Sequence, residues 1–356
     1  MKIGFLNTPD DQRCPVSVKT IKKYVDKGAQ IFIEHGTSDS ISEDFSFAEG
    51  VELTDRAKII SGADIIYSNN PMTEDEVKSA KSGAMVISSY NKFKPDDVIY
   101  EGNHDIQVFS MDMIPRTTLA QSMDVLSSMA SIAGYKAVLL AADKLPRYFP
   151  MMMTAAGTIK PSTVLILGAG VAGLQAIATS RKLGARVEAF DVRKAVKEEV
   201  QSLGAKFVEV EGSIDDKDAG GYAVEQTEEY KQKQKEKIHE RAANADVIIT
   251  TAQLRGRPAP ILITKEMVED MKFGSVIIDM ASSTGGNCEL TQDEKEINHN
   301  GVTIIGNSYL FNKAMIDASE LLANNIHDFI ATFLKEGKID IDMENEIISG
   351  SKIYPK

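Results

Sequence analysis

The stretch TVLILGAGVAGLQAIATSRKLGARVEAFDVR, residues 163–193, constrains the fold of this chain more than any other. An apolar strand runs into Gly168, Gly170 and Gly173, and a helix follows. Gly168 permits a tight turn, Gly170 lets the backbone approach a pyrophosphate, and Gly173 allows close helix–strand packing. Asp191 lies at the end of the next strand. This order predicts a dinucleotide-binding β-α-β unit, with the anion at the helix N-terminus.

Asp191 also indicates which dinucleotide binds. A carboxylate at this position accepts hydrogen bonds from an adenosine ribose and repels a 2′-phosphate, so the sequence favours NAD(H) over NADP(H). Arg193 points the other way, because an arginine near the same turn can accommodate a phosphate. We expect Val171 and Ala172, at the start of the helix, and Val192 to complete the cofactor site.

Strand and helix patterns alternate along the rest of the chain. In the first third, apolar runs such as KIGFLN and AMVISSY are separated by helix-length segments, which predicts a mostly parallel sheet. A second such series begins at Thr163, and the amphipathic segment 313–337 is expected to pack back on the first domain. We therefore predict an α/β protein of two Rossmann-like domains with mostly parallel sheets, linked by long helices, with a nucleotide cleft between them. The predicted domains are residues 1–134 with 314–356, and residues 135–313.

The composition narrows the class of protein. Acidic residues outnumber basic ones by 52 to 40, for a net charge of −12, which argues against a nucleic-acid-binding protein. Cys14 and Cys288 suggest no disulfide framework, as expected in a reducing cytoplasm, and no metal-ligand cluster stands out. The N-terminus begins as a strand, and no run reaches the roughly 18 apolar residues that a membrane helix needs. We expect a cytoplasmic protein without direct membrane insertion.

A second stretch, RTTLAQSMDVLSS, reads as a helix with two different faces. Arg116 stands just before it, and Gln121, Asp124 and Ser127 recur at steps of three to four residues. An amide, a carboxylate and a hydroxyl are therefore expected close together. The opposite stripe is apolar and is expected to pack against the protein: Leu119, Met123, Leu126 and Ala130.

The chain offers no compelling residue for proton transfer. Hydride transfer to a hydroxy acid or amino acid normally requires a general acid–base, usually a histidine or lysine. His239 and His327 lie on expected helices and read as bystanders, whereas His35 and His104 lie in loop-like contexts and stay open as candidates. A good cofactor site without a proton-transfer residue fits direct hydride exchange between two nicotinamides, which needs only binding and orientation.

Five longer motifs extend these observations over the whole chain: PRTTLAQSMDVLSSMASIAGYKAV, LGAGVAGLQAIATSRKLGARVEAFDVR, AGGYA, ITTAQLRGRPAPILIT and GSVIIDMASSTGGNCELT. In these motifs the chain resembles the NAD(H)-binding component of proton-translocating nicotinamide nucleotide transhydrogenases. Alanine dehydrogenase has the same fold and supplies the alternative interpretation, an NAD-dependent amino-acid dehydrogenase. The lysine and histidine motifs of that enzyme have no match here, where YSNNPMTEDE and VFSMDMIPRTT stand instead.

The resemblance implies a role for the second stretch. Arg116 and Gln121 would hold the nicotinamide carboxamide and nearby groups. Asp124 and Ser127 would complete the hydrogen-bond network around the nicotinamide ribose and that arginine. The ligand of this polar face is therefore expected to be the reactive half of the dinucleotide.

The resemblance also places two further segments near the nucleotide. In DAGGYA, Gly221 and Tyr222 would form a mobile loop that closes over the ligand. Beyond the apolar strand 247–249, four residues stand at a carboxyl strand end, where ligands bind in such sheets: Thr250, Thr251, Ala252 and Gln253. Gln253 and the pair Ser282–Ser283 depart from the family pattern, which leaves the details of nucleotide affinity open.

Finally, the resemblance implies an assembly. Members of this family form homodimers on the cytoplasmic face of the membrane. They pair with a membrane-spanning component and an NADP(H)-binding component. Hydride would pass from NADH on this chain to NADP⁺ on the partner, coupled to proton movement through the membrane component. A separate subunit and a fragment cut before the membrane region would have the same sequence features.

Overall fold

The computed structural model describes residues 1–90, 105–212, 227–253, 256–335 and 338–355. It divides into two compact units, Met1–Met129 with Ala314–Lys356, and Ala130–Lys313. Each unit is built on a seven-stranded sheet.

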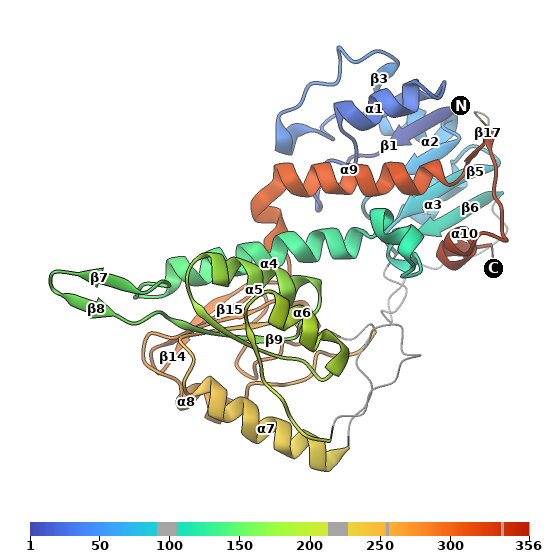
Figure 1. Ribbon diagram of the computed structural model, residues 1–356. Coiled ribbons are helices and arrows are strands. Elements are labelled where there is room, and N and C mark those ends of the chain that lie inside the picture. The colour runs from blue at the N-terminus through green and yellow to red at the C-terminus, as the bar shows by residue number, and fades with distance from the viewer. Residues whose placement is uncertain (91–104, 213–226, 254–255, 336–337, 356) are drawn as a thin grey trace. The chain divides into compact units, whose positions relative to one another are not determined.

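The first unit holds its strands in the order β18-β6-β5-β4-β1-β2-β3 (Figure 1). Neighbouring strands run parallel except at the edge pair β18–β6, which is antiparallel. The central strands are apolar and buried, as expected where helices cover both faces of a parallel sheet. The strands are β1 (Lys2–Phe5), β2 (Gln30–Glu34), β3 (Val51–Thr54), β4 (Ile65–Tyr67), β5 (Ala84–Ser88), β6 (Ile106–Ser110) and β18 (Lys352–Tyr354).

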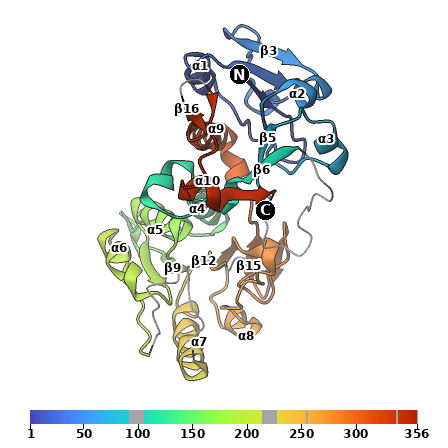
Figure 2. The same ribbon diagram turned by 90° about the vertical axis from the view of Figure 1, so that its right-hand side faces the viewer.

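Helices from both ends of the chain cover this first sheet. α9 (Met315–Ala331) lies beside α1 (Val18–Val25), as Figure 2 shows from the side, and buries Leu322, Ile326 and Phe329. The segment after α9 therefore belongs to the first unit although it follows the second in sequence. The remaining elements are α2 (Arg56–Gly62), α3 (Glu74–Lys78), α10 (Glu346–Ser351), η1 (Asp39–Ile41), η2 (Met111–Met113), η3 (Thr118–Met123), β16 (Leu334–Lys335) and β17 (Lys338–Ile339).

The second unit holds a doubly wound sheet in the order β11-β10-β9-β12-β13-β15-β14. Its strands are parallel except for the β14–β15 edge. The chain starts the sheet at the central strand β9, moves out to β10 and β11, and then returns to β12 on the other side. The strands are β9 (Thr163–Leu167), β10 (Arg186–Phe190), β11 (Lys206–Phe207), β12 (Val247–Thr250), β13 (Val276–Asp279), β14 (Glu296–His299) and β15 (Val302–Gly306).

Helices cover both faces of the second sheet, and a separate hairpin stands away from it (Figure 1). The hairpin is β7 (Met152–Thr154) with β8 (Gly157–Ile159). The helices are α4 (Val125–Lys144), which begins in the first unit, α5 (Val171–Lys182), α6 (Lys197–Ser202), α7 (Glu228–Ala242) and α8 (Lys265–Glu269). The short turns are η4 (Lys194–Val196), η5 (Ser282–Thr284) and η6 (Leu310–Ala314).

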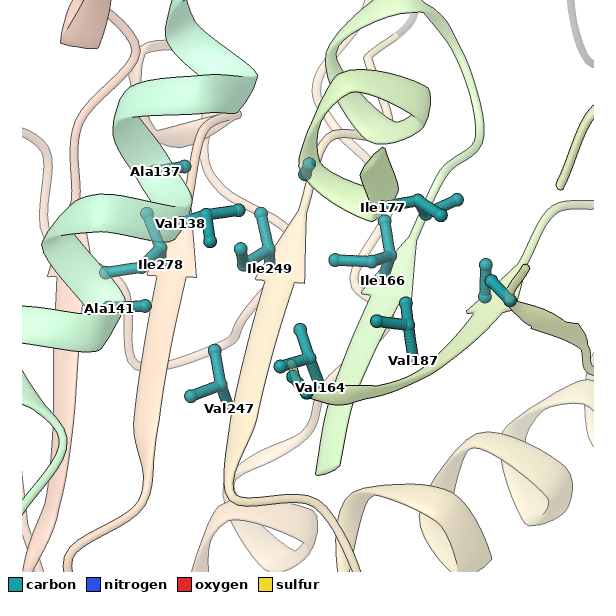
Figure 3. Close-up of a cluster of buried hydrophobic side chains, with 14 of the residues drawn as sticks. Ala137, Val138, Ala141, Val164, Ile166, Ile177, Val187, Val247, Ile249 and Ile278 are labelled. Atoms are coloured by element: carbon teal, nitrogen blue, oxygen red, sulfur yellow. The ribbon is translucent and has the colours of Figure 1, made fainter. Parts of the chain in front are cut away.

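One helix among the described residues, α4, is long and apolar enough to cross a membrane by length and composition alone. The expectation that no run meets this criterion was therefore wrong. Ala137, Val138 and Ala141 of α4 pack into the apolar core over Val164 and Ile249 (Figure 3). The apolar character of α4 is thus also that of a core helix, which passes the same test.

These observations confirm the predicted fold class, an α/β protein with two mostly parallel sheets. Three strands were not predicted: β3, β14 and β18. All three are edge strands, and β14 and β3 alternate or expose their side chains instead of forming an apolar run. An edge strand contacts a neighbour on one side only, so its sequence carries a weaker apolar signal.

Candidate functional site

The glycine turn after β9 has the geometry that its sequence predicts. Gly168 adopts φ +101°, a conformation that residues with a side chain rarely take. A Cβ on Gly173 would lie 1.9 Å from the carbonyl oxygen of Gly168, so α5 packs directly on the turn. A Cβ on Gly170 would meet nothing within 4 Å, so this side of the turn is open to a ligand.

The first turn of α5 offers its backbone N–H groups at that open side. Gly170 is the N-cap residue and brings no side chain to bond them. Val171 is 43% exposed. A Cβ on Gly134 would lie 2.2 Å from the carbonyl oxygen of Ala172, so α4 packs against this turn at backbone distance. Free N–H groups on a firmly held helix start are suited to bind an anion.

Asp191 stands beside the turn, directly after β10. Its Oδ2 accepts a hydrogen bond from the Ala169 N–H at 2.8 Å, which joins the ends of β9 and β10. Arg193 binds the same carboxylate through its backbone N–H, its Nε and its Nη2, at 2.9, 2.9 and 2.8 Å. Val192 packs against the apolar core on one face of the sheet. The two residues with opposite implications for the nucleotide are therefore an ion pair.

The end of β12 closes the other side of the turn. Thr251 donates its hydroxyl to the Gly168 carbonyl oxygen at 3.1 Å and its N–H to Leu167 at 2.9 Å. Gln253 donates its Nε2 to the carbonyl oxygen of Met280 at 3.2 Å. The strand-end residues predicted from sequence thus meet the glycine turn, because β12 is the neighbour of β9.

Sequence reasoning missed the group that holds this strand end. Asp279, fully buried at the end of β13, accepts hydrogen bonds from the Thr250 hydroxyl and from the N–H groups of Ala281, Asn287 and Cys288. Asn287 in turn accepts from the Ala252 N–H at 3.0 Å and donates to the Ala252 carbonyl at 2.8 Å. The signal was present as a polar residue ending each apolar run, VIIT and VIID.

The second predicted stretch is not one helix. Residues 118–123 form the 3₁₀ helix η3, and α4 begins at Val125. Asp124 separates them and caps α4: Oδ1 accepts from the Ser127 N–H at 2.9 Å, and Oδ2 accepts from its hydroxyl at 2.6 Å. The expected apolar stripe was wrong, because Leu119 is 77% and Leu126 42% exposed. The change of helix type at Asp124 shifts the buried face to Ala120, Met123, Val125 and Met129.

A cavity of about 280 Å³ in the first unit brings the four polar residues of this stretch together: Arg116, Gln121, Asp124 and Ser127 all line it. Thr117 lines it too, and its buried hydroxyl has no hydrogen-bond partner among the described residues. A buried polar atom without a partner is costly, so this wall suits a polar ligand.

The cavity depends on a residue from the far end of the chain. Asn325, buried on α9, donates its Nδ2 to the carbonyl oxygen of Ser122 at 2.7 Å. Ser122 is the neighbour of Gln121, so this bond fixes the part of η3 that carries the amide. Asn325 was not predicted, because it is separated from η3 by the whole second unit in sequence.

The candidate general bases lie elsewhere. His239, His299 and His327 each pair with a carboxylate, on Asp270, Glu269 and Asp328 respectively. His35 is exposed. His104, Gly221 and Tyr222 lie outside the described residues. Within the part of the chain that the structure describes, no group of three His, Cys, Asp or Glu side chains is placed to hold a metal ion.

A doubly wound sheet with an open glycine turn and a carboxylate after the second strand defines a Rossmann-type nucleotide-binding protein. The chain belongs to the alanine dehydrogenase/PNT family, whose N-terminal and C-terminal domain models match residues 7–133 and 137–354. This confirms the resemblance deduced from the motifs.

Comparison with individual proteins separates the two branches of the family. The separately encoded first portion of the NAD(P) transhydrogenase alpha subunit of Rhodospirillum rubrum is 42% identical, over 96% of this chain and 93% of that protein. A transhydrogenase structure from Sinorhizobium meliloti matches with a TM-score of 0.83 and 37% identity, over 98% of this chain and 97% of that one. An L-alanine dehydrogenase structure matches with a TM-score of 0.73 but 18% identity, over 99% and 94%, and shows the fold alone.

Proposed function

We propose that this chain is the NAD(H)-binding component of a proton-translocating NAD(P) transhydrogenase, an oxidoreductase that works with partner subunits. The observation that carries the proposal is the cavity lined by Arg116, Gln121, Asp124 and Ser127. It presents hydrogen-bonding groups, and its carboxylate is engaged in capping α4. Such a site orients a ligand without supplying a general base, which suits hydride exchange between two nicotinamides.

The glycine turn is proposed to hold the adenosine half of NAD(H). The open side of Gly170 admits the pyrophosphate, the N–H groups of the first turn of α5 bind it, and Asp191 binds the ribose. Thr250 to Gln253 would border the same ligand, and Gly221 with Tyr222 would close over it. The predicted domain of residues 135–313 would perform this part of the binding.

The domain of residues 1–134 with 314–356 is proposed to hold the nicotinamide half. Arg116 and Gln121 would bind the carboxamide, and Asp124 and Ser127 would border the nicotinamide ribose. Bound NADH supplies the hydride from C4 of its nicotinamide ring. The residues of this chain bind and orient the ring so that its reactive face stays accessible to NADP⁺.

The alternative, an alanine dehydrogenase-type reaction, needs a cation for the carboxylate of the substrate. The first unit has a second cavity, of about 420 Å³, lined by Arg13. Arg13 is engaged there by Asp11, with Nε 2.8 Å from Oδ1. The neighbouring carboxylate compensates the charge of this guanidinium, which favours hydride exchange over reaction with an amino acid.

The proposed partners are an NADP(H)-binding component, a membrane-spanning component that conducts the protons, and a second copy of this chain. The protein would then lie on the cytoplasmic face of the membrane through these partners. The β7–β8 hairpin supports the homodimer, since it exposes Met151, Met153 and Ile159 by 55%, 73% and 41%. Exposed apolar side chains on an isolated hairpin are suited to an interface between proteins.

The test follows NADH oxidation by the purified protein in two parallel assays. One contains pyruvate and ammonium, and the other contains NADP⁺ with the NADP(H)-binding component of a transhydrogenase. We expect turnover in the second assay alone. Turnover with pyruvate and ammonium would instead establish an amino-acid dehydrogenase with a catalytic base outside the residues proposed here.

A further inference from the structure

The carboxylate of Asp191 has its hydrogen-bonding capacity filled. A carboxylate accepts about four hydrogen bonds, two at each oxygen. Oδ1 accepts from the backbone N–H and the Nε of Arg193, and Oδ2 accepts from the Ala169 N–H and the Nη2 of Arg193. The side chain is also 6% exposed, so little of it faces solvent. A ribose hydroxyl can bind this carboxylate only by replacing one of these donors.

The four donors differ in how easily they can leave. The N–H groups of Ala169 and Arg193 belong to the backbone at the ends of β9 and β10, where movement would distort the sheet. The guanidinium of Arg193 is held by its side chain alone, which is 25% exposed. The guanidinium is therefore the group that a ribose displaces, and the two backbone bonds keep the carboxylate oriented while it does so.

We propose that Arg193 determines nucleotide selectivity by competing with the ribose for Asp191. This inference rests on the proposed function, in which Asp191 binds the adenosine ribose of NAD(H). In its paired position Arg193 lowers the affinity for NADH, because NADH has to break the Nε and Nη2 bonds. It also compensates the charge that would otherwise repel a 2′-phosphate, and so it raises the affinity for NADPH.

The test compares the dissociation constants of NADH and NADPH for the wild-type protein and for Arg193→Ala. An ion pair with a partly exposed arginine is worth about 0.2–1 kcal/mol, so we expect NADH to bind about threefold more tightly to the variant. NADPH is expected to bind at least about threefold more weakly, because the charge of Asp191 is then uncompensated. The ratio of the two constants would change by about tenfold.

Two further variants keep the test sharp. Arg193→Lys retains the charge but cannot bind the carboxylate with two parallel N–H groups, so its NADH affinity is expected between those of wild type and Arg193→Ala. Arg186→Ala removes an exposed arginine at the opposite end of β10 and is expected to leave both constants unchanged. Circular dichroism and the melting temperature show whether each variant is folded.

The outcomes separate the inference from the function on which it rests. Weaker or unchanged NADH binding by Arg193→Ala would overturn the competition, and weaker binding would mean that Arg193 itself contacts the nucleotide. If Arg193→Ala does not fold, the same comparison is made with Arg193→Lys. A wild-type protein that binds neither nucleotide would contradict the proposed function, and this inference with it.

Discussion

The two candidate nucleotide-binding regions are built in different ways. The glycine turn is shaped by its own residues and the adjacent strands: Gly168, Gly173 and Thr251 meet at backbone distance. The η3 segment takes its position from a remote residue, Asn325, and its end from the cap at Asp124. A motif of the first kind can be recognised in a sequence, whereas one of the second kind shows its residue types but not its shape.

The largest expected effect tests how local the glycine turn is. Gly173→Ala places a methyl group 1.9 Å from the Gly168 carbonyl oxygen, and we expect the free energy of unfolding to fall by about 3 kcal/mol. Gly170→Ala is the matched control for stability, because its methyl group meets nothing within 4 Å. It should keep the stability of the wild type and bind NADH about tenfold more weakly, since the methyl group occupies the side open to the pyrophosphate. Urea unfolding and NADH titration measure the two effects, and equal stability of both variants would contradict the packing argument.

The second effect concerns η3. Gln121→Ala should slow hydride transfer to NADP⁺ on the partner component by about 100-fold, because a nicotinamide without its amide contact is misplaced. NADH binding should weaken much less, since the turn still holds the adenosine half. Single-turnover kinetics and NADH titration separate the two quantities. An unchanged transfer rate would remove Gln121 from the site.

The third effect asks whether the remote support matters. Asn325→Asp replaces the Nδ2 donor by an oxygen that faces the Ser122 carbonyl oxygen, and the loss of one buried hydrogen bond predicts about tenfold slower hydride transfer. NADH affinity should stay within about twofold, because the glycine turn does not depend on α9. Asn324→Asp, at the half-buried neighbouring position, is the control for the added charge. Equal effects of the two variants on transfer would show that Ser122 needs no such support.

The smallest effect is one of pH on α9. Burial lowers the pKa of His327 below its usual 6.5, and Lys23 and Lys27 lower it further against the opposing effect of Asp328. The unfolded chain therefore takes up a proton at a higher pH than the folded one, so this stability is present above about pH 6.5 and is lost as the pH falls. Urea unfolding between about pH 7.5 and about pH 5.5 should show this loss in the wild type and a smaller one in His327→Gln. Identical pH profiles would exclude His327 as the cause.

The same contrast explains how much could be predicted from the sequence. The strands of both sheets appear as apolar runs, and the glycine spacing identified the turn together with its partners at Asp191 and Thr251. Helical periodicity failed at Leu119 and Leu126, because it cannot register a change from 3₁₀ to α-helix at a capping aspartate. Asn325 was beyond reach, since a contact across so many residues of chain leaves no local pattern.

The bonds of Asp279 have a consequence for how this family can vary. Its carboxylate holds the loop after β13 through the backbone N–H groups of Ala281, Asn287 and Cys288. Any residue type supplies such a donor except proline. The loop can therefore keep its shape while the side chains at Ser282 and Ser283 change, and substitutions there can accumulate without loss of the fold. The shape of the loop is inherited through one buried residue, and its surface is left free to diverge.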